Sequence, residues 1–512
     1  MEPAGRWAGR VFEPVTDDDL RLPIDLRPCS NGEYDPRPLA AVAREAVRRA
    51  REECLATADR LAMPRRRFLR TLCAASITLL ALDACTREAH RARPGATRTS
   101  EPGGGYDVPP EATTEPEAAE GAIGGEEFVM DVQGHLLEYD LNPVLHGEGF
   151  YASFPQRYCG EDDPRVCFSI EHFLEAFFIR SDTNVVVLSA LPIYPEGSPL
   201  SPEIMFETRR VVEGLCRDER ILLHGQVLPN VGPLDGVLRA MEETARRHPI
   251  RAWKTFTHFP DFFDPGGGAW WLDDHEPGVP PVGEPFIRKS VELGIDTICV
   301  HKGFSGGSRF SSPVDVGPAA RAHPDVRFVV YHSGYESGTA EGPYTTATAE
   351  IGVNRLIASL ERAGIGPNEN VYAELGSTWW NVMRSPTQAA HVLGKLLRHV
   401  GEDNVVWGTD CLFYGSPQPQ IQALRAFRIS EELQERHGYP ALTKRLKAKI
   451  LGLNAARLYG IPPVPPRCDF TRRELARIRE ELRDGDRVLG PATLAASADV
   501  REHHRMEVST TS

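Results

Sequence analysis

Short apolar runs alternate with amphipathic stretches through the middle and later parts of the chain. The runs are rich in Val, Ile and Leu, a composition typical of strands buried on both faces. We predict eight strands from them, at residues 128–133, 184–190, 221–228, 250–256, 297–301, 327–332, 371–375 and 404–410.

The stretches between these runs have the spacing of helices. Segments such as "SPEIMFETRRVVEGLCRDE" and "TQAAHVLGKLLRHVG" carry apolar residues three and four positions apart, which places them on one helical face. Strands that alternate with helices predict a parallel sheet. We therefore expect an α/β fold, a (β/α)8 TIM-type barrel over residues 126–461, with an open doubly wound sheet as the alternative.

Polar side chains stand where most of the predicted strands end. In a barrel, residues from several strand ends meet on one face, which is where chemistry takes place. An ordinary core has no reason to end so many strands in this way. The residues concerned are Gln133, His135, Lys254, His258, His301, His332, Glu374 and Asp410.

The N-terminal quarter has a different pattern. Residues 1–62 form an extension that contains an alanine-rich helix pattern, and residues 63–85 join "RRRFLR" to the apolar run "TLCAASITLLALDAC". That run is too short to span a bilayer but suits the apolar part of a signal peptide. The segment resembles a twin-arginine export signal. The alternative is a basic turn in front of a buried helix.

This resemblance predicts an exported protein with the twin-arginine machinery as a partner. Cys85 ends "LDAC", which is similar to a lipoprotein processing box, although Asp83 departs from it. The expected location is therefore the periplasm, or the membrane surface as an anchored lipoprotein. Residues 86–125 are rich in Pro, Gly, Thr and Glu and predict a disordered linker, and residues 462–512 predict a C-terminal helix and tail.

Composition narrows the class of protein. The chain has 512 residues and a formal net charge of -14, which argues against nucleic acid as a partner because phosphate binding needs basic surfaces. Ten cysteines in such a length are no disulfide framework. In an exported protein Cys159 and Cys167 could pair, whereas Cys299 and Cys411 lie in apolar strand contexts.

Four of the strand-end residues suit a metal site. His135, His301, His332 and Asp410 together offer three imidazoles and one carboxylate, a set that zinc or manganese accepts. Each histidine alone has a plain structural explanation. Four such residues at the ends of different strands favour a site.

Several motifs carry a resemblance to a known family. "DVQGH", "VHKG", "VYHSG", "WGTD" and the closing "KAKILGLNAARLYGI" resemble the amidohydrolase superfamily, and within it the amidohydrolase-2 type, which holds metal-dependent hydrolases and non-oxidative decarboxylases. The resemblance covers about residues 126–461. It implies His135, His301 and Asp410 as metal ligands, His332 as the catalytic imidazole and Asp410 also as the proton acceptor.

The chain departs from that family at the first ligand pair. Where the family usually has two histidines one residue apart, this chain has Gln133 and His135. A glutamine offers only a neutral amide oxygen, so we expect one divalent ion, zinc or else manganese. Gln133 is then a weak ligand or a hydrogen-bond partner of the bound water. The alternative is a site without metal.

Other residues are candidates for substrate binding. Lys254 could pair with Glu374 or with a substrate carboxylate, and His258 could line the pocket. The long insertion at residues 259–286 predicts a lid whose Trp270 and Trp271 contact the substrate, or else a loop packed on its own barrel. Tyr414 lies in a second loop at the same face.

The expected function is a metal-dependent hydrolase of a small carbonyl or carboxylate compound, acting through metal-activated water. One alternative is a metal-dependent non-oxidative decarboxylase of an aromatic or related acid. The other is a ligand-binding barrel that has lost its metal. The predicted partner is a small molecule, anionic or aromatic, and a homo-oligomer is left open.

Overall fold

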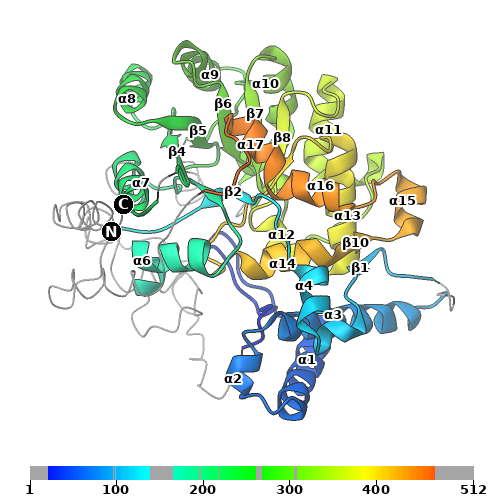
Figure 1. Cartoon of the computed structure of the whole chain (residues 1–512). Coiled ribbons are helices and arrows are strands. Elements are labelled where there is room, and N and C mark those ends of the chain that lie inside the picture. Colours follow the sequence, from blue (N-terminus) through cyan, green and yellow to red (C-terminus); the bar gives the residue numbers. More distant parts are fainter. Residues whose placement is uncertain are drawn as a thin grey trace, which may run out of the picture.

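Eight strands form one parallel sheet whose order follows the sequence (Figure 1). This is the observed architecture of a computed structural model that describes residues 21–466, except 96, 98–99, 139–164, 195–197, 217, 261–267 and 305–307. The strands of the sheet are β2 (Met130–Gly134), β3 (Val185–Leu188), β4 (Ile221–Gln226), β5 (Ile250–Phe256), β6 (Thr297–His301), β7 (Arg327–Tyr331), β8 (Val371–Glu374) and β9 (Val405–Val406).

The sheet closes on itself between its first and last strands. A parallel bridge joins Gly134 to Cys411, and Val132 N–H donates to the carbonyl of Trp407 at 3.0 Å. The predicted (β/α)8 barrel is therefore confirmed, and each predicted strand coincides with an observed one to within a few residues at either end.

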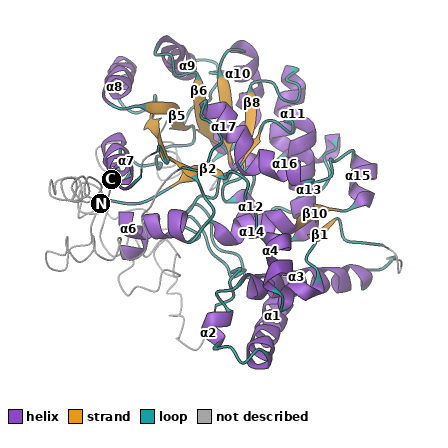
Figure 2. Ribbon diagram, viewed as in Figure 1, coloured by secondary structure: helices purple, strands orange, loops and turns teal. Residues whose placement is uncertain are grey.

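Helices surround the strands, as Figure 2 shows. Local sequence signals set their ends: the Ser201 side chain accepts a hydrogen bond from Ile204 N–H at the start of α7, and Gly364 adopts φ 71° after α11. In the barrel region the helices are α6 (Ile170–Leu174), α7 (Pro202–Leu215), α8 (Leu234–Arg247), α9 (Gly283–Glu292), α10 (Val316–Ala322), α11 (Asn354–Ala363), α12 (Thr378–Val382), α13 (Pro386–His399), α14 (Gln418–Ala426), α15 (Glu431–His437), α16 (Lys444–Ala448) and α17 (Asn454–Tyr459).

The barrel interior is a separate apolar cluster. Its residues alternate along the strands, with Ala252 on β5, Cys299 on β6 and Val329 on β7 all pointing inward. Ala455 and Leu458 of α17 belong to the same cluster. The same alternation brings Lys254, two residues after Ala252, and His301, two residues after Cys299, onto the inner face at the carboxyl ends of the strands.

The N-terminal region is folded against the barrel. It contains α1 (Ala41–Arg60), α2 (Arg65–Phe68), α3 (Leu72–Arg91), β1 (Gly104–Tyr106) and α4 (Pro116–Ile123). Figure 1 shows the three first helices grouped beside the barrel next to α4. β1 pairs antiparallel with β10 (Phe427–Ile429), so the N-terminal region adds a strand to the barrel's last βα unit.

Residues 86–125 differ from the expected disordered linker. β1 and α4 lie within this range, and α3 continues into it as far as Arg91. The physical reason is that the few apolar residues of the segment are buried: Tyr106, Ala119 and Ile123 are at most 2 % exposed. The low apolar content of the segment predicted disorder. In the structure, a small number of buried contacts order it.

The segment with the export-signal pattern, residues 63–85, forms α2 and most of α3. Ile77, Leu79 and Leu82 are buried in the main apolar cluster, and the exposed side chains of Arg65, Arg66 and Arg67 lie on α2. Among the described residues, none of the helices is both long enough and apolar enough to pass through a bilayer. The export signal stays a prediction.

Other predictions concern cysteines and the C-terminus. Cys167 and Cys216 are each in a disulfide, whereas Cys159 lies outside the described residues. Cys299 and Cys411 are buried free thiols. The predicted C-terminal helix lies almost entirely in residues 467–512, outside the described part of the chain.

The burial of α3 predicts how substitutions change the free energy of unfolding. Leu79 is 0 % exposed, so Leu79→Ala leaves a cavity and lowers the free energy of unfolding by about 2–5 kcal/mol. Leu61 is 43 % exposed, and Leu61→Ala changes it by no more than about 0.5 kcal/mol. Urea unfolding measures both. Equal effects would mean that α3 does not pack on the body of the protein in solution.

Candidate functional site

Most of the predicted site residues meet at the carboxyl end of the barrel. His135 directly follows β2, His301 ends β6, His332 directly follows β7, Glu374 ends β8 and Asp410 lies four residues after β9. All five residues are buried, at most 2 % exposed. Parallel strands end on the same rim of a barrel, so residues far apart in the sequence become neighbours.

Asp410 is the centre of the polar contacts. Its Oδ1 accepts a hydrogen bond from Gln133 Nε2 at 3.0 Å, and its Oδ2 accepts one from Ser377 Oγ at 2.5 Å. Burial raises the pKa of Asp410, but the adjacent imidazole of His135 and the Ser377 hydroxyl outweigh burial and bring the pKa below the usual range of a carboxyl. Asp410 is therefore ionised near neutral pH.

Two imidazoles lie beside carboxylates without a hydrogen bond. Nε2 of His135 is 2.9 Å from Oδ1 of Asp410, and Nε2 of His301 is 2.6 Å from Oε1 of Glu33. Yet neither ring nitrogen of either histidine has a hydrogen-bond partner. Buried polar atoms normally have one. Imidazoles and carboxylates that converge in this way are a donor set for a divalent transition metal, so these residues fit such an ion.

Glu33 comes from the N-terminal region and not from the barrel. Its carboxylate, with His301 and His332, forms a group whose ligand atoms all lie within 4.8 Å of one another. Nε2 of His332 is 3.9 Å from Oε2 of Glu33. Glu33 is not among the site residues that the sequence predicts. Its only local signal is the Asn-Gly turn of residues 31–32, which predicts a turn but not its position in the fold.

His332 is held in a defined orientation. Its Nδ1 donates to the carbonyl of Gly376 at 2.7 Å, so in the neutral ring Nε2 carries the lone pair and faces Glu33. Burial and the neighbouring His301 lower the pKa of His332 to about 4. Its backbone has φ 62°, in the left-handed region, and its N–H donates to Oε2 of Glu374 at 2.9 Å.

Glu374 fixes the backbone around the site. Besides the His332 N–H, it accepts the Gly376 N–H through Oε1 at 2.5 Å. Burial raises its pKa to about 8. No ion pair joins Lys254 to Glu374 among the described residues, although the sequence had offered this pairing. The contacts of Glu374 are those of a residue that positions His332.

Lys254 is a buried cation at the same end of the barrel. It is 1 % exposed, and its Nζ lies 3.3 Å from the centre of the Tyr331 ring. Nζ has no hydrogen-bond partner. Burial lowers the pKa of Lys254 to about 8, so the amine is still mostly protonated at pH 7. An ammonium ion in this position favours an anion nearby.

The remaining predicted residues divide into two groups. His258 lies at the site, with its ring centre 4.6 Å from that of His301, and Tyr414 is hydrogen-bonded to Ser377 at 2.6 Å. By contrast, Trp270 packs on Phe286 of α9, and Trp271 packs on Phe310. Both indoles are in packing contacts of the insertion, which is the alternative that the sequence left open for them. Residues 261–267 of the insertion lie outside the described residues.

Gln133 lies at the site, as the sequence predicted, and contacts the carboxylate of Asp410. Its amide nitrogen is bonded to Asp410, and its Oε1 has no hydrogen-bond partner. It therefore orients the carboxylate of Asp410 and, in this arrangement, does not turn its oxygen toward that group. Asp131, two residues earlier, accepts hydrogen bonds from Gln133 N–H at 3.0 Å and Thr409 N–H at 3.1 Å.

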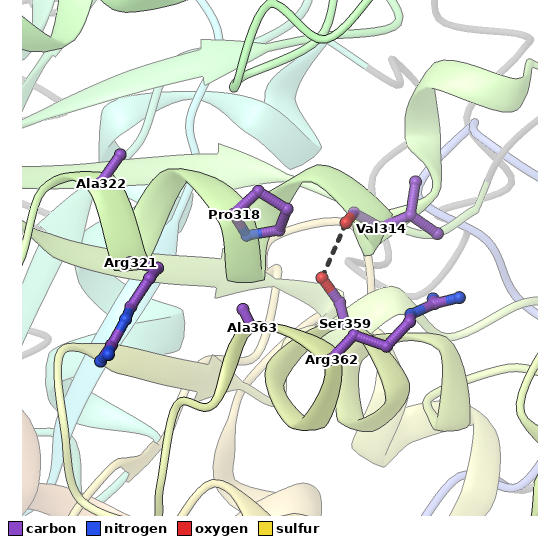
Figure 3. Close-up of a pocket in the computed structure, with 7 residues that line it drawn as sticks. All are labelled: Val314, Pro318, Arg321, Ala322, Ser359, Arg362 and Ala363. Carbon is purple, nitrogen blue, oxygen red and sulfur yellow. Dashed lines mark hydrogen bonds between the residues drawn. The ribbon is translucent and has the colours of Figure 1, made fainter.

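A surface hollow lies elsewhere, between α10 and α11 (Figure 3). Its only hydroxyl-bearing lining residue, Ser359, donates to the carbonyl of Val314 at 2.8 Å. Arg321 and Arg362 at its edges are exposed. This hollow is on the outer helical layer and has no acid, histidine or cysteine in its lining, so it is not the site of the chemistry.

The comparisons with known proteins agree with this description. Residues 207–461 match the sequence model of the amidohydrolase family of the amidohydrolase-2 type. The chain belongs to the amidohydrolase superfamily and is an enzyme of the amidohydrolase type. The search of curated proteins found no match.

Solved structures show only distant similarity. An uncharacterized TIM-barrel protein from Bordetella bronchiseptica is 14% identical, with 65% of this chain and 99% of that chain covered and a TM-score of 0.43. The 4-oxalomesaconate hydratase from Rhodopseudomonas palustris is 14% identical, with coverage of 65% and 95% and a TM-score of 0.40. The amidohydrolase 2 from Bifidobacterium longum subsp. infantis is 13% identical, with coverage of 66% and 100% and a TM-score of 0.34.

Proposed function

We propose that the protein is a hydrolase that uses one divalent metal ion to add water to a carbonyl group of a small anionic compound. The observation that carries this proposal is the pair of buried imidazoles, His135 and His301, whose nitrogens have no hydrogen bonds and lie beside carboxylates. With Asp410 they are the residues that would hold the ion. Zinc is the first choice for this donor set, and manganese the second.

A divalent ion in this place supplies a Lewis acid that polarises a carbonyl and lowers the pKa of water. The chain supplies the groups that move protons. Asp410 is ionised and is oriented by Gln133 and Ser377, so its carboxylate accepts a proton from the attacking water. Its position is fixed before substrate arrives, which avoids reorganisation during the reaction.

His332 provides a second proton-transfer group. Because its Nδ1 donates to Gly376, Nε2 is the nitrogen that faces the site. In the neutral ring this atom takes up a proton, and the ring then returns the proton to a leaving group. Glu374 keeps the ring in place through the backbone N–H of the same residue.

Lys254 favours an anionic substrate. Its ammonium group is buried and lacks a hydrogen-bond partner, so a substrate carboxylate within reach would gain a strong charge-assisted contact. The same lysine is also compatible with the second candidate function, a non-oxidative decarboxylase, because such an enzyme must bind the carboxylate group of its substrate. A barrel that only binds a ligand is the third possibility that the experiments separate.

Substitution of a proposed metal ligand tests whether the protein binds a metal ion. We expect protein purified without chelator to hold about one equivalent of zinc or manganese, and His301→Asn to hold less than about 0.2 equivalent. His275→Asn, which changes a half-exposed histidine, serves as the control and retains the metal. Elemental analysis measures the content. A wild-type protein with less than about 0.2 equivalent would contradict both enzyme functions and favour the ligand-binding barrel.

The products decide between hydrolysis and decarboxylation. We expect turnover in a panel of carboxylate-bearing esters, lactones and amides, lost after dialysis against chelator and restored by zinc or manganese. A parallel panel of aromatic acids is assayed for carbon dioxide. Release of carbon dioxide without any hydrolysis would contradict the proposed hydrolase and support the decarboxylase.

Lys254→Met tests the substrate charge. We expect KM for an anionic substrate to rise about tenfold or more, because one charge-assisted contact is worth about 1.5–3 kcal/mol. KM for a neutral analogue should change much less. Lys444→Met removes an exposed lysine and should leave both values unchanged. An equal rise for the anionic and the neutral substrate would mean that Lys254 acts on the structure and not on substrate charge.

A further inference from the structure

A short segment of the N-terminal region reaches the mouth of the barrel. We call residues 29–34 (Cys-Ser-Asn-Gly-Glu-Tyr) the N-terminal arm. It precedes β2 by almost one hundred residues, and Figure 1 shows the dark blue chain running from the side of α1 towards the strands. The family match begins only at residue 207, so the arm lies outside it.

The arm is anchored by specific contacts with the loops after β6 and β9. The Tyr34 ring stacks on Phe304 with 4.9 Å between ring centres, and its hydroxyl is 2.9 Å from that of Tyr414. Asn381 Nδ2 also donates to the Tyr34 hydroxyl at 3.0 Å. Cys29 Sγ donates to the carbonyl of Phe413 at 3.3 Å. These contacts set the direction in which Glu33 points.

The arm contacts the proposed ligands directly. Asn31 Nδ2 bridges two carboxylates, donating to Glu33 Oε2 at 2.6 Å and to Asp410 Oδ2 at 2.8 Å. The other oxygen of Glu33 is 2.6 Å from Nε2 of His301. Asn31 thus holds Glu33 and Asp410 side by side, with His301 next to them.

The surroundings of Glu33 lack a permanent cation. Its side chain is only 13% exposed, and the ion-pair distances recorded for it are to His301 and His332. No lysine or arginine among the described residues lies within 4.0 Å of its carboxylate. A carboxylate placed among imidazoles and a second carboxylate is costly to bury unless a cation joins the group.

The barrel by itself lacks the second histidine that the family usually has after the first strand, where this chain has Gln133. His135, His301 and Asp410 are three ligands, and Gln133 directs its amide nitrogen at Asp410. Zinc takes four ligands and in catalytic sites expands to five, so a fourth protein ligand still leaves a place for water. A second carboxylate would supply the donor that the usual second histidine of the family would have given.

We propose that Glu33 is a ligand of the metal ion, so that the N-terminal arm is a permanent part of the active site. This rests on the proposed function and goes beyond it, because it assigns a site residue to a region that reads as a removable leader. Processing before Cys85 would cut away residues 1–84 and with them Glu33. The enzyme with a complete site is the chain that keeps its N-terminal region.

The packing of the same region agrees with retention. α3, which contains the export-signal pattern, buries Leu79 and Leu82 completely. In the same helix, Asp83 Oδ1 accepts a hydrogen bond from the backbone N–H of Tyr106 at 2.9 Å. Asp83 also forms an ion pair with Arg87 at 2.6 Å. Asp83 is the residue that departs from a lipoprotein box, and here it joins α3 to β1.

The experiment compares two substitutions in the full-length protein. Glu33→Gln keeps the shape of the side chain but removes its charge. Asp35→Asn makes the same chemical change at an exposed carboxylate two residues away. Zinc affinity is measured by competition with a coloured chelator, and cobalt is substituted for zinc so that its visible absorption spectrum reports on the ligands.

We expect Glu33→Gln to weaken zinc binding by about tenfold or more and to change the cobalt spectrum, while Asp35→Asn matches the wild type in both. Glu33→Asp keeps the charge on a shorter side chain and should lie between them. Thermal unfolding of the metal-free proteins shows whether each variant is folded, and Glu33→Asp decides the matter if Glu33→Gln is not.

The outcomes separate this inference from the proposed function. A wild type that binds neither zinc nor manganese would overturn both. A wild type that binds zinc with the same affinity and cobalt spectrum as Glu33→Gln would overturn the role of Glu33 and leave the proposed function in place. Intact mass of the protein from its native cells gives the second readout: we expect residues before Cys85 to be present, and a chain that begins at Cys85 would overturn retention.

Discussion

The closure of the barrel between β2 and β9 is the constraint on which the site depends. Asp131 on β2 accepts hydrogen bonds from the Thr409 backbone and hydroxyl, and Asp410 N–H donates to the carbonyl of Gln133 at 3.0 Å. These bonds bring the segment after β9 against the end of β2, so His135 and Asp410 become neighbours. Asp131 is 0 % exposed, and this burial raises its pKa to about 7. A site built from residues that follow the first and last strands exists only if that seam is closed.

Burial also explains why the charged groups of the site need contacts with one another. In a buried environment a charge without a partner is costly, whereas a paired and hydrogen-bonded one is tolerated. Asp410 has its hydrogen bonds from Gln133, Ser377 and Asn31. Lys254 has the face of Tyr331 but no hydrogen bond, and His135 and His301 have free nitrogens. The groups that lack hydrogen bonds are thus the ones that the proposed metal ion and an anionic substrate would contact.

The sequence predicted the barrel well because its signals are local and repeated. Each strand is a short apolar run, and the helices have apolar residues at helical spacing, so the order of elements follows directly. The strand-end histidines and Asp410 were predictable for the same reason, since a barrel brings strand ends together. Glu33 and Asn31 were not, because their position depends on contacts with Phe304, Phe413 and Tyr414 that no local pattern encodes. The expected disorder of residues 86–125 was wrong for a related reason: Tyr106 and Ile123 each find a buried place that the composition of the segment does not show.

Gln133 connects the two parts of the structure. In the sequence, Gln133 predicted weaker metal binding, because it stands where the family usually has a histidine ligand. In the structure Gln133 orients Asp410 from one side, while Asn31 of the N-terminal arm holds the same carboxylate from the other. The arm also places the carboxylate of Glu33 beside His301. The orientation of Asp410 therefore depends on one amide from the barrel and one from the arm, each donating to a different carboxylate oxygen.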